Sequence, residues 1–262
     1  MPNDFKNILV NLEDGIETLT LNRPDKLNTL SRATLGELNR AVEELLENEK
    51  VRVGIITGAG ERAFCAGADI SELAQLKSIE AKAFAETGQQ IFNLIESGGK
   101  PFIGAVNGYA LGGGCELALA CPIRIASETA KFAQPEVKYG FTTGFGGSVR
   151  LVRAVGSARA TQLCLFGEPI DAQTALDWGL VTKVISLSEL RREAKNAAEK
   201  LASYSPTAMK STLQALQAAA DLPASQGQAY EANLFGLCFA TEDMKEGTSA
   251  FFEKRKPQFR GK

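Results

Sequence analysis

Short β-prone runs alternate with stretches of helical spacing over the first half of this chain, and this alternation constrains the fold most strongly. The runs lie at 8–12, 16–21, 53–57, 102–106 and 123–126. Asp14-Gly15 joins the first two, which is typical of a hairpin. Helical stretches separate the later runs, and strands joined through helical crossovers pair in parallel. The sequence therefore predicts an α/β fold in which a ββα unit recurs.

Helical periodicity dominates the chain after about Gly146. Ser31 is a typical N-cap for an earlier helix, whose apolar residues recur at helical spacing from Leu35 to Leu46. Further helices are predicted at 81–95, 115–120, 190–202, 207–220, 230–240 and 242–256, the last with Thr241 as its cap. We divide the chain into a core at 1–195 and a C-terminal helical region at 196–262. The second part is expected to pack on the core or on a neighbouring subunit.

Composition excludes several classes of function. With 44% apolar residues among 262, the chain can bury a substantial core, and a net charge of −2 offers no field to attract nucleic acid or an anionic membrane. The five cysteines are odd in number and form no CxxC pair, so we expect neither a disulfide framework nor a zinc site. The first residues show no signal pattern, and no apolar run approaches membrane-spanning length. We therefore expect a cytoplasmic protein.

The chain contains no histidine. This absence excludes the Ser-His-Asp and Cys-His machinery of many hydrolases. Glutamate and aspartate remain as the ordinary side chains for proton transfer near neutral pH. The chemistry is predicted to be carboxylate chemistry.

Two loops rich in glycine and alanine follow predicted strands. Residues 107–116 read Asn-Gly-Tyr-Ala-Leu-Gly-Gly-Gly-Cys-Glu, so three glycines precede a predicted helix, whose first N–H groups have no intrahelical partner. Residues 63–70 form a second turn of small residues. Each loop alone is more often a plain turn, but together they can offer one N–H apiece to the same carbonyl oxygen, as an oxyanion hole does.

Glu116 and Glu136 follow these features. Taken singly, Glu116 is more often a helix-end stabiliser and Glu136 a surface ion-pair partner. Two glutamates beside one oxyanion pocket can instead share the work of positioning water and moving its protons. We interpret them as a general acid/base pair.

These motifs resemble those of the enoyl-CoA hydratase/isomerase, or crotonase, family. The resemblance runs from Ile16 to Phe259 and rests on Phe64-Cys-Ala-Gly-Ala-Asp69, Asn107-Gly-Tyr-Ala-Leu-Gly-Gly-Gly-Cys-Glu116, Phe132-Ala-Gln-Pro-Glu136, Asn22-Arg-Pro24 and Glu246-Gly-Thr-Ser-Ala-Phe-Phe-Glu-Lys-Arg-Lys256. It implies a crotonase-like spiral of ββα units with a C-terminal helical trimerisation region. It also implies a homotrimer or a dimer of trimers that binds acyl-CoA thioesters without a metal or redox cofactor.

The resemblance also implies roles for individual residues. The N–H groups of Ala68 and Gly113 would form the oxyanion hole that stabilises an enolate. Glu116 and Glu136 would hold water, and Glu136 would supply the proton at the α carbon. Having both glutamates resembles the hydratases, which add water reversibly to trans-2-enoyl-CoA to give 3-hydroxyacyl-CoA in fatty acid β-oxidation.

Contacts with CoA are expected at the periphery. Positions matching the CoA-binding segments of the family are Lys26, Leu27, Asp69, Ile70 and Ser71. Phe235 and Lys254 match positions that reach the CoA of a neighbouring subunit, although the cations at 254–256 equally fit a solvated helix end.

Several alternatives stay open at this point. An enoyl-CoA isomerase or a C–C bond-cleaving enzyme would use the same oxyanion hole. A noncatalytic or RNA-associated member would need a basic helical stripe, which the short stretch 190–195 supplies only poorly. The sequence departs from the family pattern at Thr143 and Pro122. The aromatic residues Phe141, Phe145 and Trp178 fit either a wall of the acyl pocket or core packing, and we favour core packing because aromatic side chains are so commonly buried.

Overall fold

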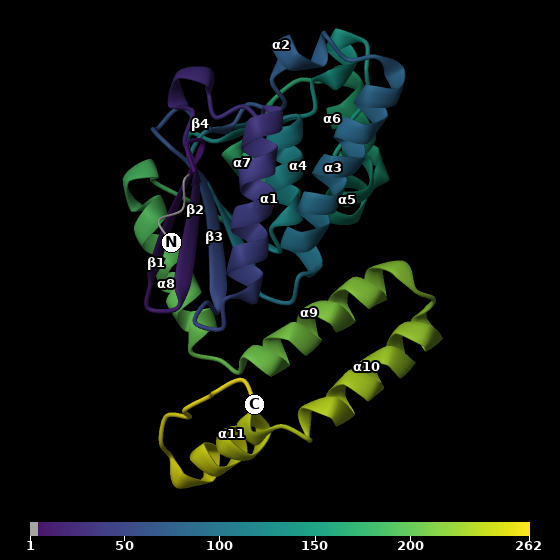
Figure 1. Cartoon of the computed structure of the whole chain (residues 1–262). Helices are drawn as coiled ribbons and strands as arrows, with labels where there is room; N and C mark the ends of the chain where they lie inside the picture. Colours follow the sequence, from purple (N-terminus) through teal and green to yellow (C-terminus); the bar gives the residue numbers. More distant parts are fainter. Residues whose placement is uncertain (1–4) are drawn as a thin grey trace.

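The computed structural model of the chain describes residues 5–262 and contains two β-sheets with helices packed around them (Figure 1). Residues 1–4, which contribute to the expectation about a signal segment, lie outside this range. The larger sheet has six strands in the order β1 (Ile8–Glu13), β2 (Ile16–Leu21), β3 (Val53–Gly58), β5 (Phe102–Val106), β7 (Ile123–Ser127) and β10 (Lys183–Ile185). The smaller sheet has four strands in the order β4 (Ala63–Cys65), β6 (Tyr109–Leu111), β8 (Lys131–Ala133) and β9 (Ile170–Asp171).

From β3 to β8, successive strands alternate between the two sheets. β3, β5 and β7 pair in parallel in the larger sheet, and the strand that follows each of them, β4, β6 and β8, pairs in parallel in the smaller one. The helices that close these units are α2 (Ile70–Leu73) with α3 (Ser78–Ser97), α4 (Gly113–Ala120), and α5 (Gly147–Val155) with α6 (Ser157–Phe166). The predicted α/β fold of recurring ββα units is confirmed. It places three strand-exit turns next to one another.

The start of the chain folds as its turn residues predict. β1 and β2 pair antiparallel, and Asp14 and Gly15 between them have φ values of 51° and 78°, as a tight hairpin turn requires. The next helix, α1 (Arg32–Glu47), is capped by the Ser31 hydroxyl, which accepts the N–H of Thr34. Between these elements lies a short turn of 3-10 helix, η1 (Pro24–Lys26).

The central strands β3 and β5 of the larger sheet are buried on both faces. On one face its side chains join a core cluster with α1, α3 and α4. On the other, Leu190, Ala194 and Ala198 of α8 (Leu187–Ala202) pack against residues of four strands. Burial on both faces explains the continuous apolar runs of β3 and β5, because parallel strands covered on both sides lack an alternating pattern.

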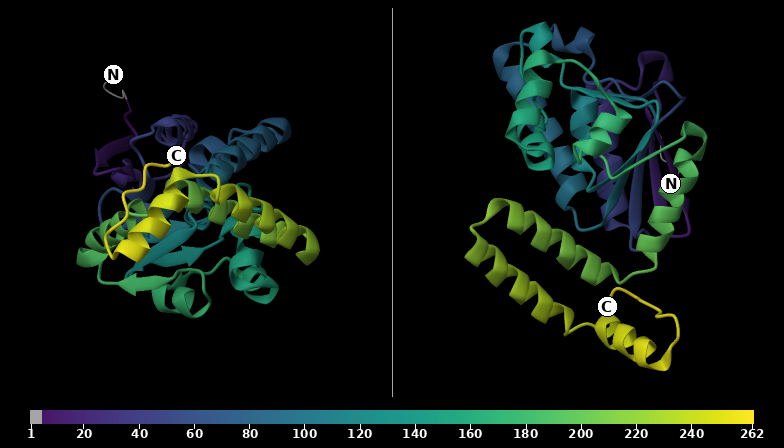
Figure 2. Two further views of the ribbon diagram at one scale, coloured as in Figure 1. Left: turned by 90° about the horizontal axis from the view of Figure 1, so that it is seen from below. Right: turned by 180° about the vertical axis from the view of Figure 1, so that it is seen from behind.

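The C-terminal helices form an arm that extends away from the core (Figure 2). It comprises α9 (Pro206–Asp221), α10 (Ala224–Cys238) and α11 (Glu242–Glu253). α9 and α10 run side by side, and the last residues return toward the core, where Arg52 donates to the carbonyl of Phe259 at 2.7 Å. Among residues 5–262, no helix is both long and apolar enough to span a bilayer.

Candidate active site

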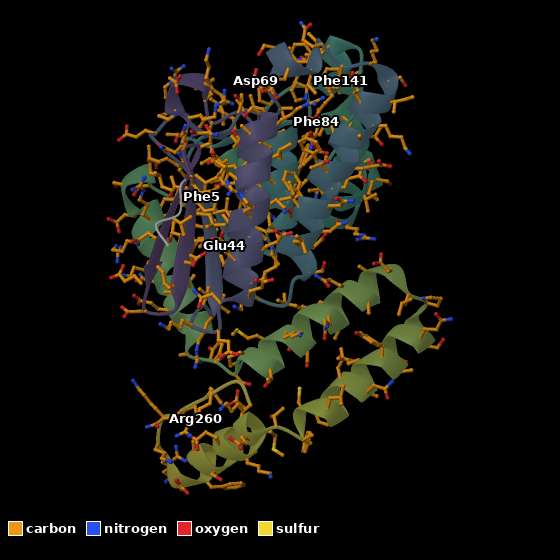
Figure 3. The ribbon with its side chains drawn as sticks, in the orientation of Figure 1. Phe5, Glu44, Asp69, Phe84, Phe141 and Arg260 are labelled. Atoms are coloured by element: carbon orange, nitrogen blue, oxygen red, sulfur yellow. The ribbon has the colours of Figure 1, made fainter. Side chains whose placement is uncertain are left out.

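An apolar cavity of about 460 Å³ opens where the strand-exit turns meet α2 and α3. Its wall includes Phe84 of α3 and Phe141 of the loop before α5, and Figure 3 shows both at the end of the core far from the arm. The charged residues that line the cavity are Glu116 and Glu136. The two predicted acid/base residues therefore lie in one mostly apolar pocket.

The two predicted donor turns converge on this cavity. Gly112 has a φ of 51°, and α4 begins at Gly113, whose N–H therefore has no acceptor in its own helix. The nitrogen of Ala68 lies 3.5 Å from the position that a Cβ on Gly113 would occupy. A Cβ on Gly114 would collide with the carbonyl oxygen of Cys65, so the close approach of the two turns requires glycine there. The backbones of Ala68 and Gly113 thus lie close together, and both residues line the cavity.

Glu116 lies in the first turn of α4 and is 1% exposed. Its Oε1 accepts the N–H groups of Phe145 at 2.8 Å and Gly147 at 2.7 Å. Burial and the charge of Glu136 raise the pKa of Glu116 to about 7, against the lowering effect of these hydrogen bonds and of Arg150. Glu116 is held firmly and titrates near neutral pH.

Glu136 opens a turn of 3-10 helix, η2 (Glu136–Tyr139), and is 7% exposed. Burial raises the pKa of Glu136 to about 7. The side chain of Gln134 is fully buried beside Glu136, and its amide is assigned with the nitrogen toward the carboxyl group, so that it donates to Oε1 at 3.0 Å and Oε2 at 3.2 Å. The expected surface ion pair for an isolated glutamate is therefore wrong for Glu136, because η2 turns its side chain inward.

The arrangement suits proton transfer to and from a molecule bound in the cavity. Two carboxyl groups that titrate near pH 7 can share one proton, so that one acts as acid while the other acts as base. Paired N–H groups beside them can stabilise a developing oxyanion.

Comparison with known proteins identifies the family of the chain. The family model described as enoyl-CoA hydratase/isomerase matches residues 11–262. The chain belongs to the enoyl-CoA hydratase/isomerase family. It is 45% identical over 253 residues to a short-chain-enoyl-CoA hydratase of Clostridium acetobutylicum, with 97% of each chain covered. It is 44% identical over 255 residues to a crotonyl-CoA hydratase of Syntrophomonas wolfei, covering 97% of this chain and 98% of the relative.

Solved structures of this family share the fold. A crystal structure of an enoyl-CoA hydratase from Bacillus anthracis is similar with a TM-score of 0.95 and 37% identity, covering 98% of this chain and all of that one. Similarity over the whole length includes the C-terminal helices. The crotonase-like fold predicted from the motifs is confirmed.

Of the residues predicted to bind substrate near the oxyanion turn, Ile70 lines the cavity. Asp69 instead caps α2 through Ser71 and pairs with Arg23 at 3.1 Å. Lys26 and Leu27 lie on the neighbouring turn, where the Leu27 carbonyl accepts the N–H of Ala66 at 3.0 Å. None of these other four residues lines the cavity, namely Lys26, Leu27, Asp69 and Ser71. Their contacts with CoA stay a prediction.

Phe235 and Lys254 lie on the arm. Phe235 of α10 is 66% exposed and borders a groove between α9 and α10, and Lys254 is the C-cap of α11. The arm and α2 lie at opposite ends of the molecule in Figure 1 and in the right-hand view of Figure 2. A single chain does not bring these two residues to its own cavity.

Several pocket residues were missed or misread from sequence. Phe141 and Phe145 line the cavity, so the interpretation of Phe141 as core packing is wrong, and Phe145 serves both roles. Trp178 does pack against the core. Thr143, the departure from the family pattern, also lines the cavity. Gln134 carried no signal of its own, although its place two residues before Glu136 in a strand-exit turn could have suggested a partner for that carboxyl group.

Pro122, the second departure from the family pattern, and the five cysteines do not line the cavity. Pro122 falls between α4 and β7, a position where proline is tolerated because the helix has already ended. All five cysteines are free, and three of them are buried. Within residues 5–262, no cluster of His, Cys, Asp and Glu could hold a metal ion.

Proposed function

We propose that this member of the family is an enoyl-CoA hydratase that adds water reversibly to trans-2-enoyl-CoA and gives 3-hydroxyacyl-CoA. The observation that carries the proposal is the pair of buried glutamates, Glu116 and Glu136, beside two adjacent N–H donors in one apolar cavity. Similarity to two named hydratases over nearly the whole chain supports the same activity. A single-base isomerase would not need both carboxyl groups.

In the proposed mechanism the thioester carbonyl accepts the N–H groups of Ala68 and Gly113. The oxygen of a water molecule held by both glutamates bonds to C3, and the electrons of the double bond move toward the thioester as an enolate. Glu116 takes a proton from the water, and Glu136 gives its proton to C2. Proton exchange with solvent then restores the pair, and no redox cofactor or metal enters the scheme.

The cavity wall also supports a proposal about the acyl chain. Beyond the two glutamates, the lining toward α2 and α3 is apolar and includes Leu73, Leu76, Ala81, Phe84 and Ala85. A hydrocarbon chain gains free energy on leaving water for such a wall, whereas an acyl chain ending in a carboxylate would bury an unpaired charge there. We infer that unsubstituted short and medium enoyl chains are the substrates.

We also infer assembly into a trimer or a dimer of trimers through the region 196–262. The arm exposes large apolar side chains at Leu216, Phe235, Leu237, Phe239, Phe251 and Phe252. Burial of such residues between subunits is favourable, and it would carry Phe235 and Lys254 to a neighbour's CoA. The free cysteines fit a reducing compartment, and we infer a cytoplasmic location.

The test is the loss of ultraviolet absorbance of the conjugated thioester when purified protein is mixed with crotonyl-CoA. We expect rapid loss, which continues with longer trans-2-enoyl-CoAs and falls sharply with an enoyl chain that ends in a carboxylate. Binding of all these esters without any loss of absorbance would contradict the proposed hydration and favour isomerisation or C–C cleavage.

A further inference from the structure

Arg150 of α5 is a buried cation with no part in the mechanism above. It is 6% exposed, and its guanidinium donates to three groups. These are the carbonyl of Phe145 at 2.9 Å, the side-chain oxygen of Asn93 at 2.6 Å and the carboxylate of Glu96 at 2.9 Å. The last two lie on α3. Arg150 therefore ties the turn before α5 to a long helix of the core.

The turn at 144–147 connects Arg150 to Glu116. The carbonyl of Phe145 accepts from Arg150, while the N–H of the same residue donates to Glu116. The other donor to Glu116 is the N–H of Gly147. A Cβ on Gly146, between the two donors, would collide with the Arg150 guanidinium, so the cation packs directly on this turn.

We propose that Arg150 is a positioning residue for the reaction, which anchors the turn so that its two N–H groups hold the Glu116 carboxylate in place for water. The proposal rests on the proposed role of Glu116 in hydration. A planar guanidinium suits this role because it can bind three acceptors at fixed angles, which an ammonium cannot. Other anchors of the turn are the Phe145 ring, packed against Phe84 and Phe92, and Gln89, which donates to the carbonyl of Gly144 at 2.8 Å.

Charged and titratable groups face Glu116 from several elements. They are Glu136 of η2, Arg150 of α5, Cys115 of α4 and Cys164 of α6, with Glu96 of α3 beyond Arg150. Burial raises the pKa of both thiols, so they stay uncharged near pH 7. The Arg150 charge lowers the pKa of Glu116, and its loss, together with a loosened turn, should raise that pKa above its present value of about 7.

Arg124 offers a matched control. It is also a poorly exposed arginine that donates to backbone carbonyls, those of Leu180 at 2.6 Å and Cys121 at 2.5 Å. Within residues 5–262, none of the hydrogen bonds of the Arg124 side chain leads to Glu116. Arg124→Met should therefore lower stability without changing the titration of Glu116.

The experiment compares Arg150→Met, Arg150→Lys and Arg124→Met in crotonyl-CoA hydration across pH. We expect Arg150→Met to lose about 10–100-fold in kcat with little change in KM, since a small displacement of a catalytic group has effects of this size. The acid limb of its kcat profile should move to higher pH. Arg150→Lys keeps the positive charge but loses the planar, forked donors of the guanidinium. The acid limb of its kcat profile should therefore stay near that of the wild type, and its kcat should lie between those of Arg150→Met and the wild type.

The inference is wrong if Arg150→Met keeps the wild-type acid limb, or if Arg124→Met shifts the limb equally. Should Arg150→Met fail to fold, the kcat values of Arg150→Lys and Arg124→Lys are compared instead, because only Arg150→Lys should have a reduced kcat, and equal kcat values would contradict the inference. Failure of the proposed function is distinct, since the wild type would then hydrate no enoyl-CoA at all.

Discussion

The cavity and the C-terminal arm differ in how fully a single chain buries their side chains and supplies their hydrogen-bond partners. At the cavity, Glu116 and Glu136 are buried, and each has hydrogen-bond donors from its own chain. On the arm, Phe251 and Phe252 are 78% and 81% exposed. The contrast supports the proposal that the acid/base groups are assembled within one subunit, whereas a neighbouring subunit covers the arm. Changes at the cavity should therefore alter kcat, and changes on the arm should alter assembly and KM.

The largest effect is expected from Glu136→Gln at the cavity. Glutamine keeps the shape of the side chain but cannot deliver a proton to C2. We expect turnover of crotonyl-CoA to fall about 10²–10⁴-fold, the usual contribution of a general acid or base, while binding of an unreactive acyl-CoA stays close to that of the wild type. A variant that keeps wild-type turnover would place proton transfer on another group.

Loss of an oxyanion donor should have the next largest effect. Gly113 is the first residue of α4, a position that accepts proline without disturbing the helix. Gly113→Pro removes the N–H and should reduce kcat about 10²–10³-fold. Gly113→Ala is the control, because it adds a Cβ at 3.1 Å from the Phe145 ring but keeps the N–H. Equal activity of the two variants would exclude a catalytic N–H at this position.

A charge on the arm should separate assembly from chemistry. The double variant Phe251→Glu and Phe252→Glu places two carboxylates where we expect a subunit interface. Sedimentation should show smaller particles, and KM for crotonyl-CoA should rise about tenfold, since that corresponds to only 1.4 kcal/mol of lost binding. Leu9→Glu, on the half-exposed outer strand, is the control and should leave both unchanged. Intact assembly in the double variant would show that this part of the arm does not form the subunit interface.

The smallest expected effect is a pH-dependent gain in stability. Burial raises the pKa of Glu136 from 4.5 to about 7, so the folded state holds a proton that the unfolded state has released. The free energy of unfolding therefore falls as pH rises from about 4.5 to about 7. Glu136→Gln removes this penalty and should be more stable than the wild type at pH 8 by about 1–3 kcal/mol.

Denaturant unfolding at pH 8 and pH 4 checks this prediction. Near pH 4 the carboxyl group is protonated in both states, so the difference between wild type and Glu136→Gln should largely disappear. A gain of equal size at both pH values would show that side-chain packing, and not ionisation, causes it.

Local signals in the sequence predicted much of the fold. Asp14-Gly15 and the Ser31 cap act over a few residues, and the hairpin and α1 follow them closely. The strands of the smaller sheet have three residues or fewer, too short for any periodicity, and only pairing between distant segments creates them. β10 is equally short and forms through pairing with β7, in a part of the chain where helical periodicity dominates the sequence.

The candidate active site was likewise predicted only in part. Residue types, glycine positions and the family resemblance singled out Ala68, Gly113, Glu116 and Glu136, and the structure brings these four together at the cavity. The burial of Glu136 and the position of Phe141 depend on how η2 and its following loop fold back, which no local pattern encodes.

A double-mutant cycle on the two glutamates tests the central claim most directly. Hydration of crotonyl-CoA is measured for the wild type, Glu116→Gln, Glu136→Gln and the double variant, with acyl-CoA binding measured in parallel. If the carboxyl groups work as one unit, the double variant should be about as slow as the slower single variant. Independent, multiplicative losses, or a single variant with wild-type turnover, would contradict the claim that Glu116 and Glu136 move the protons together.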